Sequence, residues 1–327
     1  MVRFGIIGTN MITERFLEAA STMSEFKLTA VYSRSEERAK EFALKHGAEF
    51  IYTDLERMAA SEELDAVYIA SPNSLHSEQA IRMMNRGKHV LCEKPIASNS
   101  KQLQDMIDAA AANQVVLMEA MKSTLMPGFE RIQEELPKLG TVRKFNVNYC
   151  QYSSRYDAYK EGTVLNAFKP EFSNGALMDI GVYCIYPMVV LFGQPENVKA
   201  TSVMLDSGVD GEGSIVLQYK EMEGVITYSK ITNSYLPSEI QGESGSMVID
   251  HISTPGKVQI HYRQGETETI SKALNDHAMK YEAAEFIRLV QSGELESRVN
   301  SHHHSSVTMA IIDTVRRQIG LVYPADR

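Results

Sequence analysis

The sequence contains few cysteines, no basic block and no metal-binding pattern. Its 327 residues include three cysteines, Cys92, Cys150 and Cys184, with no C-x-x-C pair and no histidines at ligand spacing. A small, odd number of thiols is typical of a reducing compartment, so we expect a cytoplasmic protein. The formal net charge is −9. The missing basic cluster argues against a nucleic-acid partner, because phosphate contacts supply most of such binding.

Segments that would direct the chain to a membrane are also missing. Met1 leads directly into a strand-like run, without the charged leader and apolar stretch of a signal peptide. The most apolar later run, Tyr183 to Phe192, is too short to span a bilayer and contains Pro187. We therefore expect no membrane partner.

Three adjacent histidines, His302, His303 and His304, resemble a metal tract. Neighbouring helical residues point in different directions, and no carboxylate is spaced to complete a site. We interpret the histidines as the entry to a helix near 307–319 and expect no bound metal.

The first third of the chain alternates strand-like and helix-like segments. Strands are expected at about 4–7, 27–32, 49–52, 65–70, 88–92 and 115–118, with amphipathic helices between them. This alternation predicts an α/β fold with a doubly wound parallel sheet. At 327 residues the chain is long for one core, and we predict a Rossmann domain over 1–122 and a second domain over 123–327.

The second domain has a different pattern. Short alternating strands are expected at about 141–149, 198–205, 214–219, 225–231, 239–241, 246–249 and 258–262, with few helices between them. They predict an α+β domain with a large, mostly antiparallel, open-faced sheet. An apolar open face would need a cover, most simply a second subunit, so we expect a homodimer or homotetramer.

The turn after the first strand suits a dinucleotide. The fingerprint G-x-G-x-x-G aligns with Gly8, Asn10 and Thr13, and asparagine tolerates left-handed geometry better than most residues. A helix follows, whose first amides are expected to face a pyrophosphate. We assign to the cofactor the residues Gly8, Thr9, Asn10, Met11 and Ile12.

The second strand ends in Ser33 and Arg34, with Arg38 one turn later, where NAD-specific sites usually have an acidic residue. A hydroxyl and guanidinium groups suit a 2′-phosphate, so NADP is favoured over NAD. The alternative is a capping serine before a solvated helix.

Polar residues also follow the fourth and fifth strands. After the fourth come Ser71, Pro72 and Asn73, with His76 in the next helix; each could bind a ligand, or Asn73 could cap the helix and His76 be structural. After the fifth come Glu93 and Lys94, where proline ends the strand. The alternative there is a surface ion pair.

An apolar helix in the second domain carries Asp179 and Tyr183, four residues apart and therefore on one face. They either project into a cleft or form an Asp–Tyr bond that ties the helix to the core. Polar residues before this helix are candidate substrate contacts, namely Arg155, Tyr156, Asn166 and Lys169.

Together these elements resemble the glucose–fructose oxidoreductase/inositol dehydrogenase (Gfo/Idh/MocA) family over essentially the whole chain. Tyr183 and the segment Met118-Glu119-Ala120 resemble the branch that contains dimeric dihydrodiol dehydrogenase and D-xylose dehydrogenases. The chain departs from the family pattern at Asn10 and Asn174.

The resemblance implies hydride transfer between NADP or NAD and a sugar, polyol or dihydrodiol-type alcohol or carbonyl. It implies Tyr183 as general acid/base, Lys94 as its electrostatic partner, Asp179 as an orienting group and Glu93 near the nicotinamide ribose. A phenol has an ordinary pKa near ~10, and a neighbouring ammonium lowers it. The alternative hypothesis is a non-catalytic NAD(P)-binding sensor on the same fold. The presence of both Lys94 and Tyr183 favours the enzyme.

Overall fold

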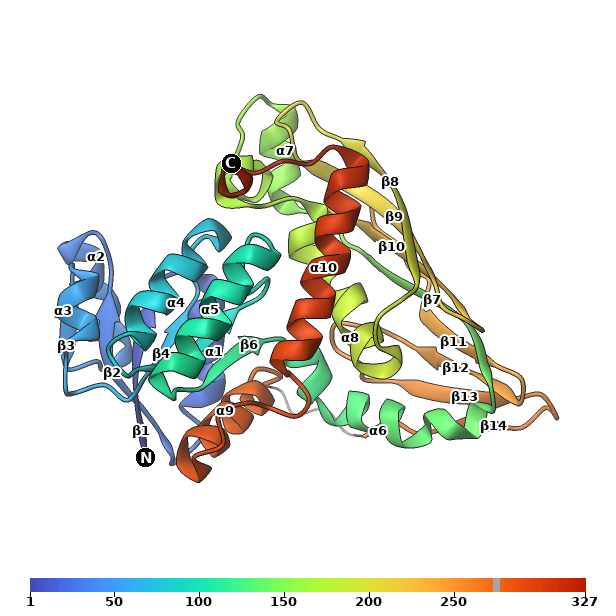
Figure 1. The fold of residues 1–327 in the computed structure, drawn as a ribbon, viewed down its shortest axis with the longest axis horizontal. Helices are drawn as coiled ribbons and strands as arrows, with labels where there is room; N and C mark the ends of the chain where they lie inside the picture. The colour runs from blue at the N-terminus through green and yellow to red at the C-terminus, as the bar shows by residue number, and fades with distance from the viewer. Residues whose placement is uncertain (273–276) are drawn as a thin grey trace. The chain divides into compact units, whose positions relative to one another are not determined.

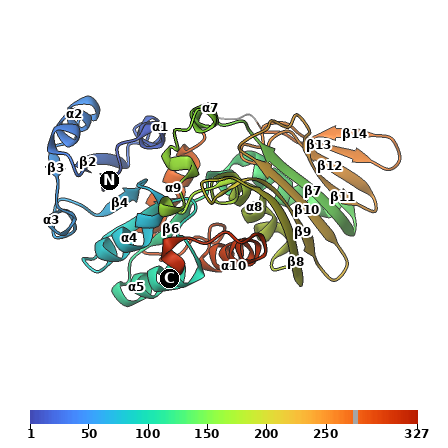
Figure 2. The same ribbon diagram turned by 90° about the horizontal axis from the view of Figure 1, so that it is seen from above.

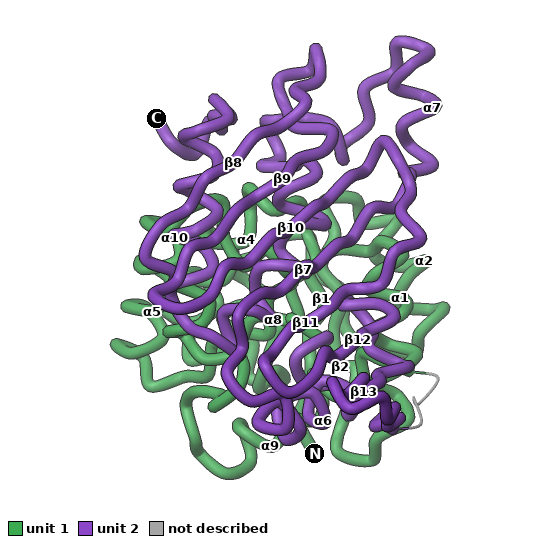
Figure 3. The backbone as a smooth tube through the Cα atoms, turned by 90° about the vertical axis from the view of Figure 1, so that its right-hand side faces the viewer, with its two compact units in different colours: residues 1–122, 276–306 green, residues 123–275, 307–327 purple. Residues whose placement is uncertain are grey.

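The computed structural model describes residues 1–272 and 277–327, which divide into two units (Figures 1 and 3). The first unit comprises Met1–Lys122 and Asp276–Ser306. The second comprises Ser123–Asn275 and Val307–Arg327. Each unit is built around a sheet of its own.

The segment 277–306 departs from the predicted second domain, because it packs with the first unit. Helix α9 (Lys280–Ser292) lies against α1 (Met11–Ala20) and β1 (Val2–Ile7). The ring of Phe286 in α9 lies 5.7 Å from that of Phe4 in β1, and both side chains are fully buried. Aromatic burial of this kind contributes strongly to a core, which explains why a late segment returns to the first one.

The first unit contains a six-stranded sheet in the order β3-β2-β1-β4-β5-β6, and every pair of neighbours is parallel. This confirms the predicted doubly wound sheet. The strand order reverses between β1 and β4, which creates the switch point of the sheet. The other elements are β2 (Phe26–Tyr32), β3 (Phe50–Tyr52), β4 (Ala66–Ile69), β5 (His89–Glu93), β6 (Leu117–Ala120), α2 (Glu36–His46), α3 (Leu55–Ala59), α4 (His76–Met84) and α5 (Ser100–Asn113).

The second unit contains an eight-stranded sheet in the order β14-β13-β12-β11-β7-β10-β9-β8. Its neighbours are antiparallel except β10 and β7, so the predicted, mostly antiparallel sheet is confirmed. The strands are β7 (Val142–Cys150), β8 (Asn197–Met204), β9 (Asp210–Gln218), β10 (Glu223–Ser229), β11 (Ser238–Gly242), β12 (Gly245–Ile249), β13 (Val258–Tyr262) and β14 (Thr267–Thr269). Strand β14 was not predicted, because three polar residues carry no hydrophobic alternation.

One face of this sheet is covered by helix α8 (Val182–Phe192), which packs on β7 and β10 (Figure 2). The residues that face it are apolar and buried, among them Phe145, Ile226 and Ile240. The unit's other helices are α6 (Pro127–Glu135), α7 (Ser154–Lys160) and most of α10 (His302–Ile319).

The opposite face of the sheet, here called the open face, is more polar than the sequence suggested. The registers place on it the cross-strand neighbours Lys144 and Glu223, with Nζ 2.9 Å from Oε1, and the row Lys199, Val216 and Val225. The predicted interface required an apolar face. The apolar side chains on this face are scattered valines among charged and polar residues.

One helical stretch, Pro170–Phe192, is long and apolar enough to cross a membrane, and 72% of its apolar window is buried inside the protein. The core helix of a soluble protein meets the same test, and α8 has that position against its sheet.

Candidate active site

The carboxyl edge of the parallel sheet brings together the predicted cofactor residues. They lie at or directly after the ends of β1, β2, β4 and β5, which are adjacent in the sheet. Ligands of open parallel sheets bind at this edge, beside the switch point. The residues found there are Gly8, Thr9, Asn10, Met11, Ile12, Ser33, Arg34, Arg38, Ser71, Pro72, Asn73, His76, Glu93 and Lys94.

The turn after β1 depends on Gly8 and Asn10. Gly8 has a φ of 111°, and a Cβ there would lie 2.6 Å from the carbonyl oxygen of Ala70, so only glycine fits. Asn10 is extended, with a φ of −115°, so the tolerance of asparagine for left-handed geometry is not needed here. It caps α1 instead: its Oδ1 accepts from the amides of Ile12 and Thr13, and its Nδ2 donates to Ala70 O at 2.6 Å.

The end of β2 presents a cationic edge to this turn. The guanidinium of Arg38 donates from Nε to Thr9 Oγ1 at 2.7 Å and from Nη2 to Thr9 O at 2.6 Å. Ser35 caps α2, as the alternative interpretation proposed, while Arg34 is exposed. The glycine cradle and the positive charge of the two arginines fit the phosphates of a dinucleotide. The Ile12 and Thr13 amides at the start of α1, expected to face a pyrophosphate, are bonded to Asn10 instead.

His76 joins two of the site loops. It is fully buried, with Nδ1 3.0 Å from Pro95 O and Nε2 2.9 Å from Ser71 O. Burial lowers its pKa to about 4, so the ring is neutral at pH 7. These contacts favour the structural interpretation: His76 holds the loop after β4 against the loop after β5.

Lys94 stands out within a buried segment. From Val90 to Asn99 every residue is buried except Lys94, which is half-buried, and its peptide bond to Pro95 is cis. Glu93 is 6% exposed and accepts a bond from Tyr68 Oη at 2.6 Å. Burial raises the pKa of Glu93, while the nearby Lys94 and the Tyr68 bond oppose that shift. The surface ion-pair alternative is therefore wrong.

Sequence reasoning assigned no role to three ionisable groups near this loop, of which Glu119 and Glu282 are buried and Lys122 is half-buried. Burial raises the pKa of Glu119 to about 7; its Oε1 accepts from Ile96 N at 3.1 Å and its Oε2 from Ser305 Oγ at 2.7 Å. Burial also raises the pKa of Glu282 and lowers that of Lys122, and each charge partly stabilises the other. The sequence pointed to Glu119 only as part of the segment Met118-Glu119-Ala120, and no spacing links residues so far apart as a cluster.

The candidate groups of the second unit share one face of one helix. Between Gly175 and Val189 every residue is buried except Asp179 and Tyr183, which are half-buried. The helix begins with a π-helical turn over Leu177–Gly181, a feature common at functional sites. The ring of Tyr183 lies edge-on to that of Tyr149, with centroids 5.9 Å apart. The structure therefore supports the predicted shared face.

Two further charged side chains hold this helix in place. Asp210, fully buried, accepts from Leu177 N at 2.7 Å through Oδ2, and burial raises its pKa to about 6. A Cβ at Gly175 would strike the other oxygen of Asp210, which explains the glycine. Lys230 donates from Nζ to Asp179 Oδ2 at 2.6 Å. Lys230 directly follows β10 just as Lys94 follows β5, but the strand predicted at 225–231 included Lys230, so its place at a strand end was not predicted.

The four candidate substrate residues all lie in the second unit, in α7 or the loop after it. Tyr156 is half-buried, with its ring 5.7 Å from that of Tyr159 and 5.8 Å from that of Phe168. Arg155 and Asn166 are exposed, and Lys169 is half-buried.

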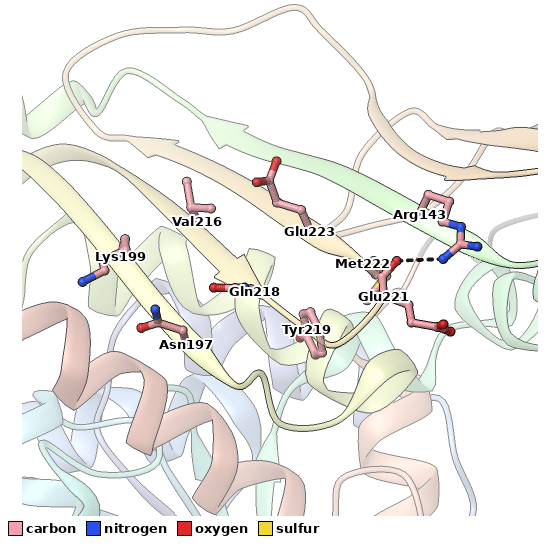
Figure 4. Close-up of a pocket in the computed structure, with 9 residues that line it drawn as sticks. All are labelled: Arg143, Asn197, Lys199, Val216, Gln218, Tyr219, Glu221, Met222 and Glu223. Atoms are coloured by element: carbon pink, nitrogen blue, oxygen red, sulfur yellow. Dashed lines mark hydrogen bonds between the residues drawn. The ribbon is translucent and has the colours of Figure 1, made fainter.

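A shallow hollow on the second unit lies away from these groups. It is lined by residues of β8, β9 and the β9–β10 turn, including Lys199, Gln218 and Glu221, with Arg143 Nη1 donating to Glu221 O at 3.3 Å (Figure 4). This turn precedes β10, whereas Lys230 follows it, so about 20 Å of strand separates them. We assign the hollow no role in the chemistry.

Comparison with known proteins decides the family. A model described as "Oxidoreductase family, NAD-binding Rossmann fold" matches residues 2–121, and one for the GFO/IDH/MocA C-terminal domain matches residues 135–248. The chain belongs to the Gfo/Idh/MocA family. It is therefore an NAD(P)-dependent oxidoreductase.

Relatives of this family match over the full length. The chain is 59% identical to scyllo-inositol 2-dehydrogenase (NADP(+)) IolU of Bacillus subtilis, with 100% of both chains covered. It is 32% identical to trans-1,2-dihydrobenzene-1,2-diol dehydrogenase of Danio rerio, with 99% of both covered. A solved levoglucosan dehydrogenase in complex with NADH and levoglucosan has the same fold, with a TM-score of 0.86 at 21% identity over 98% of this chain and 97% of the other.

Proposed function

We propose that this chain is a cytoplasmic, NADP(H)-dependent dehydrogenase that oxidises a secondary hydroxyl of a cyclic polyol of the inositol class. The observation that carries the proposal is the 59% identity, over the whole of both chains, to an NADP-dependent scyllo-inositol dehydrogenase. The serine and two arginines at the end of β2, where an NAD-specific acid is missing, support NADP.

The cofactor would be held at the carboxyl edge of the parallel sheet. Gly8 and Asn10 would approach the pyrophosphate, Ser33 and Arg34 the 2′-phosphate, and Glu93 the nicotinamide ribose. The nicotinamide, when bound, accepts the hydride from the alcohol carbon. Arg38 both adds positive charge and fixes Thr9 in the turn.

Side chains of the protein would accept and return the proton of the substrate hydroxyl. As the carbinol C–H electron pair leaves, the O–H bond breaks, its proton passes to the Tyr183 phenolate, and a ketone remains. Lys94 favours the phenolate and stabilises negative charge that develops on the substrate oxygen. Asp179 orients the substrate hydroxyl. In the reverse direction Tyr183 returns the proton to the carbonyl oxygen.

Turnover with defined substrates tests the proposal. Purified protein is mixed with NADP⁺ or NAD⁺ and a panel of inositol stereoisomers, aldoses and a dihydrodiol, and nicotinamide absorbance is followed. We expect turnover of a cyclic polyol, with NADP⁺ preferred. Tight NADPH binding without turnover of any panel member would instead support the sensor hypothesis.

The assembly we propose is a homodimer or homotetramer formed through the open face. Support comes from the exposed apolar residues there and in the neighbouring β10–β11 loop, where Tyr235 is 94% and Leu236 75% exposed. Asn148, on the open face, donates to Leu236 O at 2.7 Å, which ties this loop to that face.

Sedimentation tests the assembly. Val216→Arg, on the open face, should shift the protein toward monomer, because it adds a charge to the buried interface. The matched control is Leu44→Arg on α2, since Leu44 is 88% exposed in the first unit and should leave the assembly unchanged. A wild-type monomer at micromolar concentration would overturn this part alone.

A further inference from the structure

Lys230 is a buried lysine at the end of a strand. It directly follows β10, and its side chain is 3% exposed. Lysine is almost never buried to this extent unless its charge is paired, because the ammonium loses its hydration. Its burial therefore depends on specific contacts.

Lys230 is fixed through both its side chain and its backbone. Its Nζ donates to Asp179 Oδ2 at 2.6 Å and lies 5.2 Å from the centre of the Phe168 ring. Its backbone N–H donates to Gly211 O, and its carbonyl accepts from Ser153 N, each at 2.9 Å. The ammonium thus has little freedom to move.

The two partners of this ion pair differ in exposure. The side chain of Asp179 is 39% exposed, against 3% for Lys230. Exposed ion pairs contribute little, because two mobile side chains must be ordered in water. Here Lys230 is already immobilised in the core. Its ammonium therefore fixes the Asp179 carboxylate on the helix face that also carries Tyr183.

We propose that Lys230 is a positioning residue of the active site: its buried ammonium fixes the Asp179 carboxylate, and through it the orientation of the substrate hydroxyl. The inference rests on the proposed function, because Asp179 needs a substrate to orient. Lys230 acts through Asp179 and is not itself a catalytic residue.

The same ammonium connects Asp179 with the candidate substrate residues of α7. Phe168, beneath the ammonium, is fully buried and lies 5.8 Å from Tyr156 and 5.5 Å from Tyr159, measured between ring centroids. All of these residues belong to the second unit. Loss of Lys230 should therefore disturb substrate binding and leave the cofactor site of the first unit unchanged.

A double-mutant cycle tests the proposal. Lys230→Met keeps the length and packing of the side chain and removes its charge; it is compared with Asp179→Asn and with the double variant. We expect Lys230→Met to lower kcat/KM for the polyol on the order of 10²-fold, mostly through a higher KM, because small misplacements cost about this much. The NADPH Kd of Lys230→Met should stay within about twofold of wild type. The double variant should lose no more kcat/KM than Asp179→Asn alone.

Lys88→Met is the matched control. Lys88 is also buried, in the first unit, where its Nζ donates to the carbonyls of Ser61 and Leu64. It should lower the unfolding temperature without changing the polyol KM. If Lys230→Met fails to fold, the double variant still decides the question by comparison with Asp179→Asn, because it leaves neither the Asp179 carboxylate nor the buried Lys230 ammonium unpaired.

Each remaining outcome has one meaning. An active wild type with an unchanged KM in Lys230→Met overturns this inference and leaves the proposed function standing. Additive losses in the double variant also overturn it, since Lys230 would then act independently of Asp179. A wild type without turnover overturns both.

Discussion

The two units present their candidate catalytic groups in the same way but support them differently. In the first, Lys94 is the half-buried residue of an otherwise buried segment from Val90 to Asn99. In the second, Asp179 and Tyr183 are the half-buried residues of a buried helix. In both, burial of the neighbours leaves the reactive side chains few directions in which to point.

The difference lies in how buried charge is balanced. Around Lys94, the carboxyls of Glu93, Glu119 and Glu282 all have pKa values raised by burial, and the amine of Lys122 has a lowered one. In the second unit, Lys230 meets Asp179 directly at 2.6 Å. The groups around Lys94 shift one another's protonation, whereas the Lys230–Asp179 ion pair fixes the position of a side chain. The predictions below test this contrast, in order of decreasing effect.

Removal of one catalytic candidate from each unit should have the largest effect. Lys94→Met and Tyr183→Phe should each lower kcat/KM on the order of 10²–10⁴-fold, because each removes a group that acts on the substrate oxygen. Tyr183→Phe should leave the NADPH Kd, measured by fluorescence, at the wild-type value, since Tyr183 belongs to the other unit. Full activity in either variant would contradict the assignment for that unit.

The raised pKa of Glu119 makes the first unit sensitive to pH. Between about pH 4.5 and 7 the unfolded chain ionises this carboxyl while the folded chain keeps it protonated, so stability is lost as pH rises. The loss is at most about 3 kcal/mol. Glu119→Gln resembles the protonated acid. In this variant the free energy of unfolding, measured with urea, should depend less on pH between about 4.5 and 7.

Asp210 supplies the contrast in the second unit. Its pKa, raised from 3.8 to about 6, adds a separate dependence below about pH 6 that Glu119→Gln should not remove. An unchanged profile between pH 6 and 7 in Glu119→Gln would show that Glu119 is ionised in the folded protein.

Variants of Arg34 and Arg38, which follow β2, should distinguish recognition of the 2′-phosphate from support of the cofactor-binding turn. Arg34→Ala should weaken NADPH by about 10- to 10²-fold, the value of a charge-assisted bond, and NADH hardly at all. Arg38→Ala should weaken both, because it also releases Thr9. Equal losses of NADPH and NADH in Arg34→Ala would remove the argument for a 2′-phosphate site.

Asn10 should produce the smallest effect. Asn10→Ala removes a helix cap and should cost about 1 kcal/mol of unfolding free energy, as should Asn99→Ala at the cap of α5. Of these two cap variants, only Asn10→Ala should change the NADPH Kd. We expect the Kd to fall about 2- to 5-fold, meaning tighter binding, because the amides of Ile12 and Thr13 become available to the cofactor. Weaker binding would mean that the Asn10 side chain itself contacts the cofactor.

Hydrophobic periodicity predicted both sheets and most of their strands, because buried parallel strands and half-buried antiparallel strands have different patterns. It missed helix α7, which buries none of its residues, and the three-residue strand β14. It also placed 277–306 in the second domain, whereas the structure groups this segment with the first unit, because the Phe286–Phe4 contact has no local signature.

For the site, motifs predicted Gly8, Lys94, Asp179 and Tyr183, since each follows a recognisable strand or helix signal. They did not reveal Glu119, Glu282 or Asp210, whose significance depends on what surrounds a fully buried carboxyl. The sequence located the turn after β1, but not the role of Asn10 as the cap of α1.

By itself, then, the sequence determined which side chains are available for chemistry, because strand ends and helix spacing are properties of neighbouring residues. Tertiary structure decided their charge states and their fixed positions. Burial sets the pKa of Glu119, and contact across 51 residues of chain places Lys230 behind Asp179. Desolvation and long-range contact exist only once the chain has folded.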